Sequence, residues 1–146
     1  YHRMFDINVF GLLMATKEAI KHFNPIGGSI VNIGSVASTK AFAQGSVYCA
    51  TKASVDAITR CLGVELGPRQ IRVNSINPGM VETEFSEVRF GDKERAKKVY
   101  QGLKALTPED IAEAISWSVR QPKHVNIQEV VLYPTAQASP NHVFRT

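Results

Sequence analysis

Tyr48 and Lys52 are the residues whose types and spacing most clearly suggest chemistry. They stand at i and i+4 in Tyr48-Cys-Ala-Thr-Lys52, so on a helix both side chains project from one face. A free tyrosine has a pKa of about 10 and is a poor proton donor or acceptor at neutral pH. A lysine cation a few ångströms away favours the phenolate and moves that pKa toward the working range. The pair therefore predicts a proton-transfer site.

Context separates this pair from a second one with the same spacing, Tyr100 and Lys104. The second pair spans Gly102 and follows a long polar stretch, so we interpret it as surface. Ser35, in contrast, lies thirteen residues before Tyr48, at the carboxyl end of a predicted buried strand. Ligands of open α/β sheets bind beyond the carboxyl ends of the strands. A serine hydroxyl there can donate to a substrate oxygen, and the loop and helix that follow return Tyr48 to the same place.

Three helices and three strands alternate along the chain. Hydrophobic residues at three- and four-residue steps predict the first two helices, and Thr107-Pro108 marks the start of the third. β-Branched runs predict strands buried on both faces. The predicted elements are, in order, a helix over 4–23, a strand over 29–34, a helix over 47–66 with Ser46 as N-cap, a strand over 71–76, a helix from Thr107 to Pro122 and a strand over 127–133. The remaining segments are predicted as a loop over 36–45, a polar loop over 80–92 followed by a short helix to about residue 101, and a polar tail from residue 134.

This order of elements is that of a parallel α/β sheet. Three strands are few for an open parallel sheet that is covered on both faces. The chain also opens with Tyr1 rather than methionine and shows no signal-peptide pattern. We therefore predict a doubly wound parallel sheet of which residues 1–146 form a single domain, with an N-terminal part cut away or left out.

Composition and charge argue against several other classes of protein. The net charge of +4 is mild, and the basic cluster at 93–98 is interleaved with acidic residues, which favours a solvated helix face over a nucleic-acid surface. The sequence has no run of about eighteen apolar residues, so no membrane span is expected. The four histidines are scattered, and Cys49 and Cys61 lack a CxxC spacing, so neither a metal site nor a disulfide is expected. We interpret the cysteines as two buried, reduced thiols of a cytoplasmic protein.

Four segments together resemble the short-chain dehydrogenase/reductase family. They are Asn8 in DINVFG, the run GSIVNIGSVAS that contains Ser35, YCATK and NPGMVET, in the order and spacing of the family from Asn8 to Thr83. The resemblance implies a Rossmann-like doubly wound sheet, of which this chain is the C-terminal catalytic part. It also implies an oxidoreductase that moves hydride between a nicotinamide cofactor and an alcohol or carbonyl substrate.

The catalytic tetrad of the family falls on Asn8, Ser35, Tyr48 and Lys52. The resemblance makes Tyr48 the general acid in carbonyl reduction and the general base in alcohol oxidation, and Ser35 the group that orients and polarises the substrate oxygen. Lys52 would lower the phenol pKa and hold the nicotinamide ribose. Asn8, through its main chain, would anchor a water that links Lys52 to solvent. Taken singly, Asn8 could be only a polar helix position, and Ser35 could bond its own backbone.

The family's Pro-Gly-x-x-x-Thr element falls on Pro78, Gly79 and Thr83. The resemblance places these residues and Val81, with Tyr48 and Lys52, around the nicotinamide and its carboxamide. Thr83 could alternatively cap a short turn. The glycine-rich phosphate turn of the family is absent, because the only Gly-rich stretch, at 27–28, precedes a strand and cannot hold a pyrophosphate. We therefore expect the chain to be inactive alone.

The second half of the chain is similar to the NADP-dependent 3-hydroxy acid dehydrogenases. The segments that carry this resemblance are TEFSEVRFGDKERAKKVYQ, LTPEDIAEAISW, HVNIQEVVLYPT and QASPNHVFR. It implies NADP and substrates such as serine or allo-threonine. A guanidinium can bind a substrate carboxylate through two parallel hydrogen bonds, and we predict Arg89 first and Arg145 second for this role. Arg89 could instead be a surface residue paired with Glu87 or Asp92.

Some alternatives stay open at the level of sequence. NAD is not excluded, because the discriminating residues follow the second strand of the absent half. A non-catalytic nucleotide-sensing or interaction protein of the same fold is the alternative function, although an intact tetrad disfavours it. The resemblance also implies a homo-oligomer, expected to be a tetramer in which the helices of Asn8 and Tyr48 pack against a partner.

Overall fold

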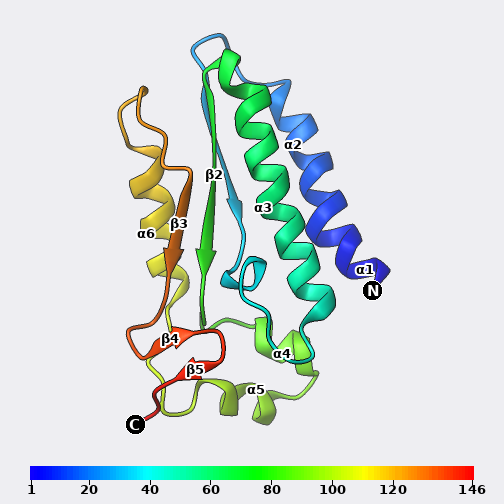
Figure 1. The fold of residues 1–146 in the computed structure, drawn as a ribbon, viewed down its shortest axis with the longest axis vertical. Helices are drawn as coiled ribbons and strands as arrows, with labels where there is room; N and C mark the ends of the chain where they lie inside the picture. Colours follow the sequence, from blue (N-terminus) through cyan, green and yellow to red (C-terminus); the bar gives the residue numbers. More distant parts are fainter.

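A three-stranded parallel sheet organises the chain in the computed structural model, which describes residues 1–146. The strands are β1 (Gly28–Ile33), β2 (Ile71–Pro78) and β3 (Glu129–Leu132), in the order β1-β2-β3. All three run in the same direction, so their carboxyl ends meet at one edge of the sheet (Figure 1). The parallel α/β prediction is confirmed, although β3 is shorter than the predicted strand over 127–133.

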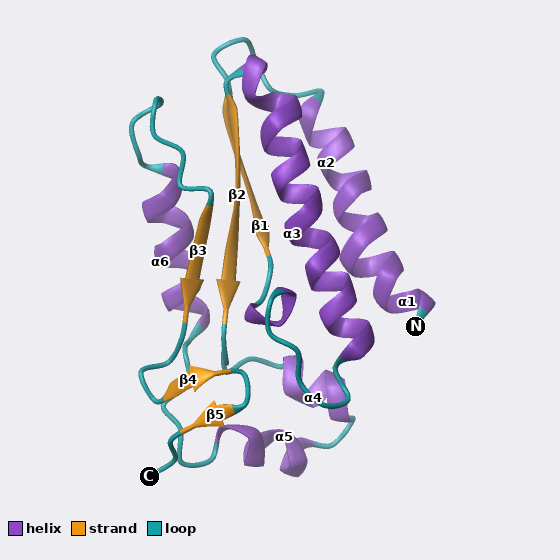
Figure 2. Ribbon diagram, in the orientation of Figure 1, coloured by secondary structure: helices purple, strands orange, loops and turns teal.

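One face of the sheet is covered by two long helices that lie side by side (Figure 2). The first consists of α1 (His2–Phe5), the π-helical turn η1 (Asp6–Gly11) and α2 (Leu12–Ile20), and the second is α3 (Ser46–Leu66). Leu66, Ile71 and Val73 form the buried core between them and the sheet, with Ile20, Phe23, Ile30 and Leu62 packed against it. Both helices were predicted, but the first ends at residue 20 rather than 23.

The helix α6 (Pro108–Val119) lies on the other face of the sheet. Side chains alternate between the two faces along a strand, so Arg72 points away from the face that Ile71 and Val73 share with α3. The guanidinium of Arg72 donates to the carbonyls of Val119 at 2.8 Å and Gln121 at 3.0 Å, at the end of α6. The predicted start of this helix is confirmed, because Thr107 and Asp110 form a reciprocal capping box.

Three details of the sequence prediction are wrong. The N-cap of α3 is Gly45, and Ser46 is the first helical residue. The predicted loop over 80–92 contains the helix α4 (Phe85–Phe90), which precedes α5 (Lys93–Tyr100). The tail forms a hairpin of β4 (Gln137–Ser139) and β5 (His142–Val143), which lies near α5 (Figure 1).

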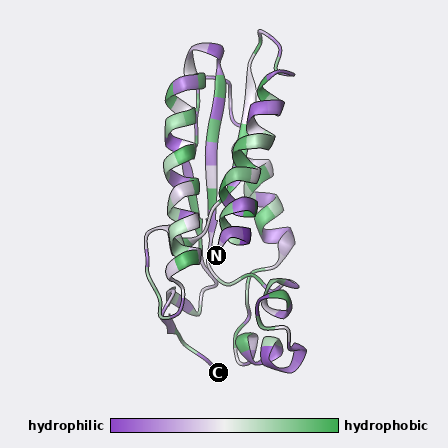
Figure 3. Ribbon diagram, turned by 90° about the vertical axis from the view of Figure 1, so that its right-hand side faces the viewer, coloured by the Kyte–Doolittle hydropathy of each residue, from purple (hydrophilic) through white to green (hydrophobic).

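Much apolar surface faces outward. Ile7, Phe10 and Met14 are exposed on the first long helix, and Cys61 is exposed on α3, which contradicts the prediction that both thiols are buried. Hydrophobic residues are spread along the helices (Figure 3). None of the helices combines the length and the apolar character needed to cross a membrane.

Candidate active site

Ser35 lies at the carboxyl edge of the sheet, two residues after β1 ends. Its side chain is buried, and its Oγ accepts a hydrogen bond of 3.1 Å from the N–H of Ala37, which caps the short 3₁₀ turn η2 (Val36–Ser38). The backbone bond considered for this residue from the sequence is therefore present. It uses only an acceptor site of the hydroxyl, so the proton of Ser35 is still available for donation.

Tyr48 lies in the first turn of α3 and is half-buried. Its ring centroid is 6.4 Å from that of Phe42 and 5.8 Å from that of Phe85. Burial raises the pKa of Tyr48, because the charged phenolate loses solvation, while the Ser35 side chain and the Arg89 cation act in the opposite direction. The structure thus brings Ser35 and Tyr48 together, as the sequence predicted.

The ammonium of Lys52 points toward the end of β1. Its Nζ donates to the carbonyl of Ile33 at 2.9 Å and lies 5.9 Å from the centre of the Tyr48 ring. Burial lowers the pKa of Lys52, and the negative charge of Asp56 opposes that effect. The role predicted for Lys52, as a cation that lowers the pKa of Tyr48, stays a prediction, and the Arg89 cation acts in the same direction.

Asn8 lies in the π-helical turn of the first long helix. Its Nδ2 donates to Thr51 Oγ1 at 3.1 Å, and that hydroxyl in turn donates to the main-chain carbonyl of Tyr48 at 2.8 Å. The side chain of Asn8 therefore connects the two long helices beside the tyrosine. Single π-helical turns inside α-helices are frequent at functional sites.

The turn after β2 is held against the C-terminal segment. The N–H of Gly79 donates to Leu132 at 2.7 Å, and the N–H of Met80 donates to the side chain of Gln137 at 2.8 Å. A Cβ at Gly79 would lie 2.5 Å from the Gln137 oxygen and 2.8 Å from the Tyr133 ring, so this close approach requires glycine. Pro78 is the last residue of β2, which places the whole turn at the edge that carries Ser35.

Val81 and Thr83 continue this turn into α4. The Oγ1 of Thr83 accepts from the N–H of Phe85 at 3.2 Å, so the capping role considered for this threonine is also present. The hydroxyl of Tyr100 donates to the Val81 carbonyl at 2.9 Å and is 2.8 Å from Ser86 Oγ. Tyr100 is thus half-buried and connects α5 to this turn, which corrects its interpretation as surface.

The structure separates the two arginines predicted to bind a carboxylate. Arg89 is exposed on α4, with its guanidinium 5.7 Å from the centre of the Phe42 ring and 5.0 Å from that of Phe90. It forms no ion pair with Glu87 or Asp92. Arg145 instead donates to the carbonyls of Val99 and Gln101 at the end of α5. Of these two arginines, only Arg89 influences the pKa of Tyr48.

Two aromatic residues of the site were not found from the sequence. Phe42 comes from the loop before α3, and Phe85 begins α4, which was predicted as loop. No periodic pattern marks either of them, because only the tertiary fold brings them to the Tyr48 ring. No group of three or more His, Cys, Asp or Glu side chains is arranged to hold a metal ion.

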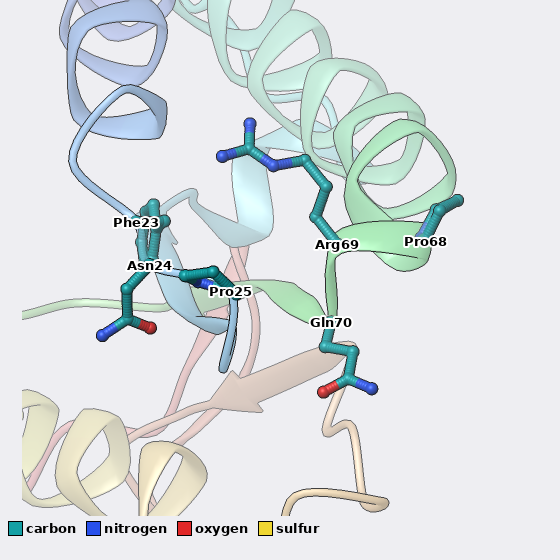
Figure 4. Close-up of a pocket in the computed structure, with 6 residues that line it drawn as sticks. All are labelled: Phe23, Asn24, Pro25, Pro68, Arg69 and Gln70. Atoms are coloured by element: carbon teal, nitrogen blue, oxygen red, sulfur yellow. The ribbon is translucent and has the colours of Figure 1, made fainter.

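A hollow lies at the opposite edge of the sheet. It has a volume of about 300 Å³ and is lined by Phe23, Asn24, Pro25, Pro68, Arg69 and Gln70 (Figure 4). These residues precede β1 and β2, so the pocket is at the amino ends of the strands. It is therefore separate from the edge that carries Ser35 and Tyr48.

Comparison with known proteins places this arrangement in a family. A family model described as enoyl-(acyl carrier protein) reductase matches residues 1–121. The chain belongs to the short-chain dehydrogenase/reductase family. The fold agrees, since a solved structure of serine dehydrogenase in its closed form with NADP⁺ superposes on 97% of this chain with a TM-score of 0.89 and 41% identity.

Curated relatives of this short-chain dehydrogenase/reductase include two NADP-dependent 3-hydroxy acid dehydrogenases. The one from Schizosaccharomyces pombe is 40% identical over 144 residues, which are 97% of this chain and 56% of the relative. The one from Escherichia coli K12 is 42% identical over 141 residues, which are 94% of this chain and 57% of the relative. The superposition with the solved serine dehydrogenase covers 59% of that protein's chain. The chain thus spans little more than half the length of the relatives it matches.

Proposed function

We propose that the full-length protein transfers a hydride between NADP(H) and a small 3-hydroxy acid such as serine or allo-threonine. The observation that carries this proposal is the position of Arg89, whose guanidinium lies 5.7 Å from the centre of the Phe42 ring that borders Tyr48, and whose charge opposes the effect of burial on the pKa of Tyr48. A guanidinium beside the proton-transfer group suits a substrate whose carboxylate lies two carbons from its reacting hydroxyl. The names of the relatives support both the cofactor and the substrate class.

In the oxidation direction, Tyr48 acts as the general base and Ser35 orients the substrate hydroxyl. The Tyr48 phenolate accepts the hydroxyl proton, while the Ser35 hydroxyl donates to the same substrate oxygen. The bound nicotinamide supplies the acceptor for the hydride. In reduction, the protonated phenol returns the proton to the carbonyl oxygen. Phe42 and Phe85 border the ring and limit the access of water to it.

The residues at this edge have the donors that the nicotinamide half of the cofactor requires. Lys52 uses one of its three protons on Ile33, which leaves two for the ribose hydroxyls. The N–H groups of Val81 and Thr83 donate to no acceptor within the chain, so they can meet the carboxamide oxygen. The Pro78–Gly79 turn supplies the surface against which the ring packs. The main chain of Asn8 would anchor a water near Lys52.

A substrate panel tests the proposed function. The full-length protein should oxidise serine and allo-threonine with NADP⁺, and with a kcat/KM roughly 30- to 150-fold above that for their methyl esters, because the ester removes about 2–3 kcal/mol of charge-assisted bonding. The same assay with NAD⁺ compares the two cofactors. Tight NADPH binding without turnover of any 3-hydroxy acid would contradict the enzyme and favour a nucleotide-sensing role.

We also propose that the full-length protein is a homotetramer in the cytoplasm. The exposed residues Ile7, Phe10 and Met14 recur at three- and four-residue steps, so they form one apolar stripe on the first long helix. Such a stripe suits a contact with a second copy. Cys49 and Cys61 are free thiols, as is usual in a reducing compartment.

A further inference from the structure

A buried polar cluster lies between α3 and β2, beneath the catalytic edge. Asp56 and Asn77 are 5% and 1% exposed, and the Nδ2 of Asn77 donates to Asp56 Oδ1 at 3.3 Å. The same nitrogen donates to Glu129 Oε1 on β3 at 2.7 Å. Two carboxylates on the amide nitrogen determine which way the amide faces, because only the nitrogen can donate to them. The Oδ1 of Asn77 must therefore point the other way.

That oxygen points at Gly34, the residue directly before Ser35. The Oδ1 of Asn77 has no hydrogen-bond partner, and a Cβ built on Gly34 would lie 1.8 Å from it and 3.2 Å from Asp56 Oδ1. The end of β1 thus packs with its bare Cα directly against the cluster, a contact at which a Cα–H can point at a carbonyl oxygen. Gly34 lies between Ile33, whose carbonyl accepts from Lys52, and Ser35.

The cluster also places a negative charge next to the lysine. Asp56 follows Lys52 by four residues on α3, and its charge raises the pKa of Lys52 against the effect of burial. The other titratable or charged groups around this part of the site are Tyr48 and Cys49 on α3, Arg89 on α4 and, through the amide of Asn77, Glu129 on β3. The hydrogen bonds from β1 and the first long helix to α3 in this part of the site involve neutral groups, the Ile33 carbonyl and the Asn8 amide.

We infer that Asp56, held by Asn77, is a positioning residue for the catalytic edge. Its carboxylate, together with Asn77, fixes the position of the end of β1 at Gly34. It also places a fixed negative charge one helical turn from Lys52. It acts through Lys52 and Ser35 and does not touch the substrate. The inference rests on the proposed roles of Tyr48, Ser35 and Lys52.

The test replaces Asp56 with asparagine, which keeps its shape and removes its charge. The control is Glu65→Gln, which removes one charge from an exposed position on the same helix. In the full-length protein, we expect Asp56→Asn to lower kcat for serine by about tenfold with KM within about twofold, because misplacement of catalytic groups acts on the chemical step. The basic limb of the kcat profile should move to lower pH, since Lys52 loses its proton more easily. Asp56→Glu, which keeps the charge, should return the basic limb of the kcat profile to its wild-type position.

A second readout follows the charge of Lys52 without turnover. Lysines methylated with ¹³C-formaldehyde and a borane reductant are titrated by NMR, and the Lys52 signal is identified by its absence in Lys52→Arg. Its midpoint should fall in Asp56→Asn and stay at the wild-type value in Glu65→Gln. Since this titration requires no activity, it separates failure of the inference from failure of the proposed function.

Two results would overturn the inference. One is a Lys52 midpoint and a pH profile in Asp56→Asn that superpose on those of the wild type. The other concerns Asn77→Ser, which serves if Asp56→Asn does not fold. It releases the Asp56 carboxylate from the amide that fixes its position and should move the Lys52 midpoint away from its wild-type value, so an unchanged midpoint there overturns the inference as well.

Discussion

Arg89 and Ser35 are the groups that lower the pKa of Tyr48, against the larger effect of burial. In the proposed function, these two groups lie on the side of the phenol at which the substrate would bind. A substrate carboxylate that pairs with Arg89 would cancel part of that charge and favour the protonated phenol. In oxidation, the residue that holds the carboxylate would thus also influence the pH at which the base works.

Replacement of Arg89 by methionine tests this double role. We expect the KM for serine to rise roughly 30- to 150-fold, because about 2–3 kcal/mol of charge-assisted bonding is lost, while uncharged alcohols are spared. The acid limb of oxidation should move to higher pH, since loss of the Arg89 cation raises the pKa of Tyr48 and the phenolate is the active form. Arg60→Met on α3 is the matched control, because Arg60 is exposed and has no hydrogen-bond partner. Equal loss on charged and uncharged substrates would show that Arg89 is not the carboxylate group.

The elements were predictable where a single periodic pattern dominates. The helices of Asn8 and Tyr48 and the strands β1 and β2 follow from their hydrophobic spacing. The helix α4 was not predictable, because its six residues mix apolar, polar and charged types over too short a segment to show a helical period, and its place depends on the Tyr100 hydroxyl. The N-cap of α3 was misassigned, since Ser46 is a frequent cap residue but the chain turns one residue earlier, at Gly45.

Arg72 is the side chain that attaches α6 to the sheet. Its guanidinium donates to Ser29, Val119, Gln121 and Val125 at 2.8–3.1 Å. Arg72→Met leaves the Ser29 hydroxyl and these three carbonyls without this donor, so we expect the free energy of unfolding to fall by about 2–4 kcal/mol in urea titration. The kcat of the folded enzyme should stay within about twofold of wild type. A loss below about 0.5 kcal/mol, comparable to that of Arg60→Met, would contradict this role.

At the scale of the whole molecule, the sequence was sufficient to predict the parallel sheet and the edge of it at which the site lies. It did not show that the C-terminal segment closes this edge. That closure depends on Gln137, whose amide accepts from Met80, and on Asn141, whose side chain donates to the Ala41 carbonyl at 3.1 Å. Contacts across a hundred residues leave no mark in local spacing, so only the structure reveals them.

The exposed stripe on the first long helix predicts the oligomeric state. The full-length protein should be a tetramer by light scattering at micromolar concentration. Phe10→Asp, at a position 57% exposed in the chain, should shift it to a smaller species, because a charge cannot be buried in an apolar contact without a large cost. Ile26→Asp, 65% exposed in the loop before β1, should not. A monomeric wild type would rule out the proposed assembly.

The most direct test of the proposed mechanism is the turnover of Tyr48→Phe in the full-length protein. This change removes only the hydroxyl that carries the proton and leaves the ring between α3 and its aromatic neighbours. With serine and NADP⁺, kcat should fall by about 10²–10⁴-fold or more, while NADPH affinity and the thermal transition stay close to those of wild type. If the variant retained more than half of the wild-type kcat, Tyr48 would not be the proton-transfer residue.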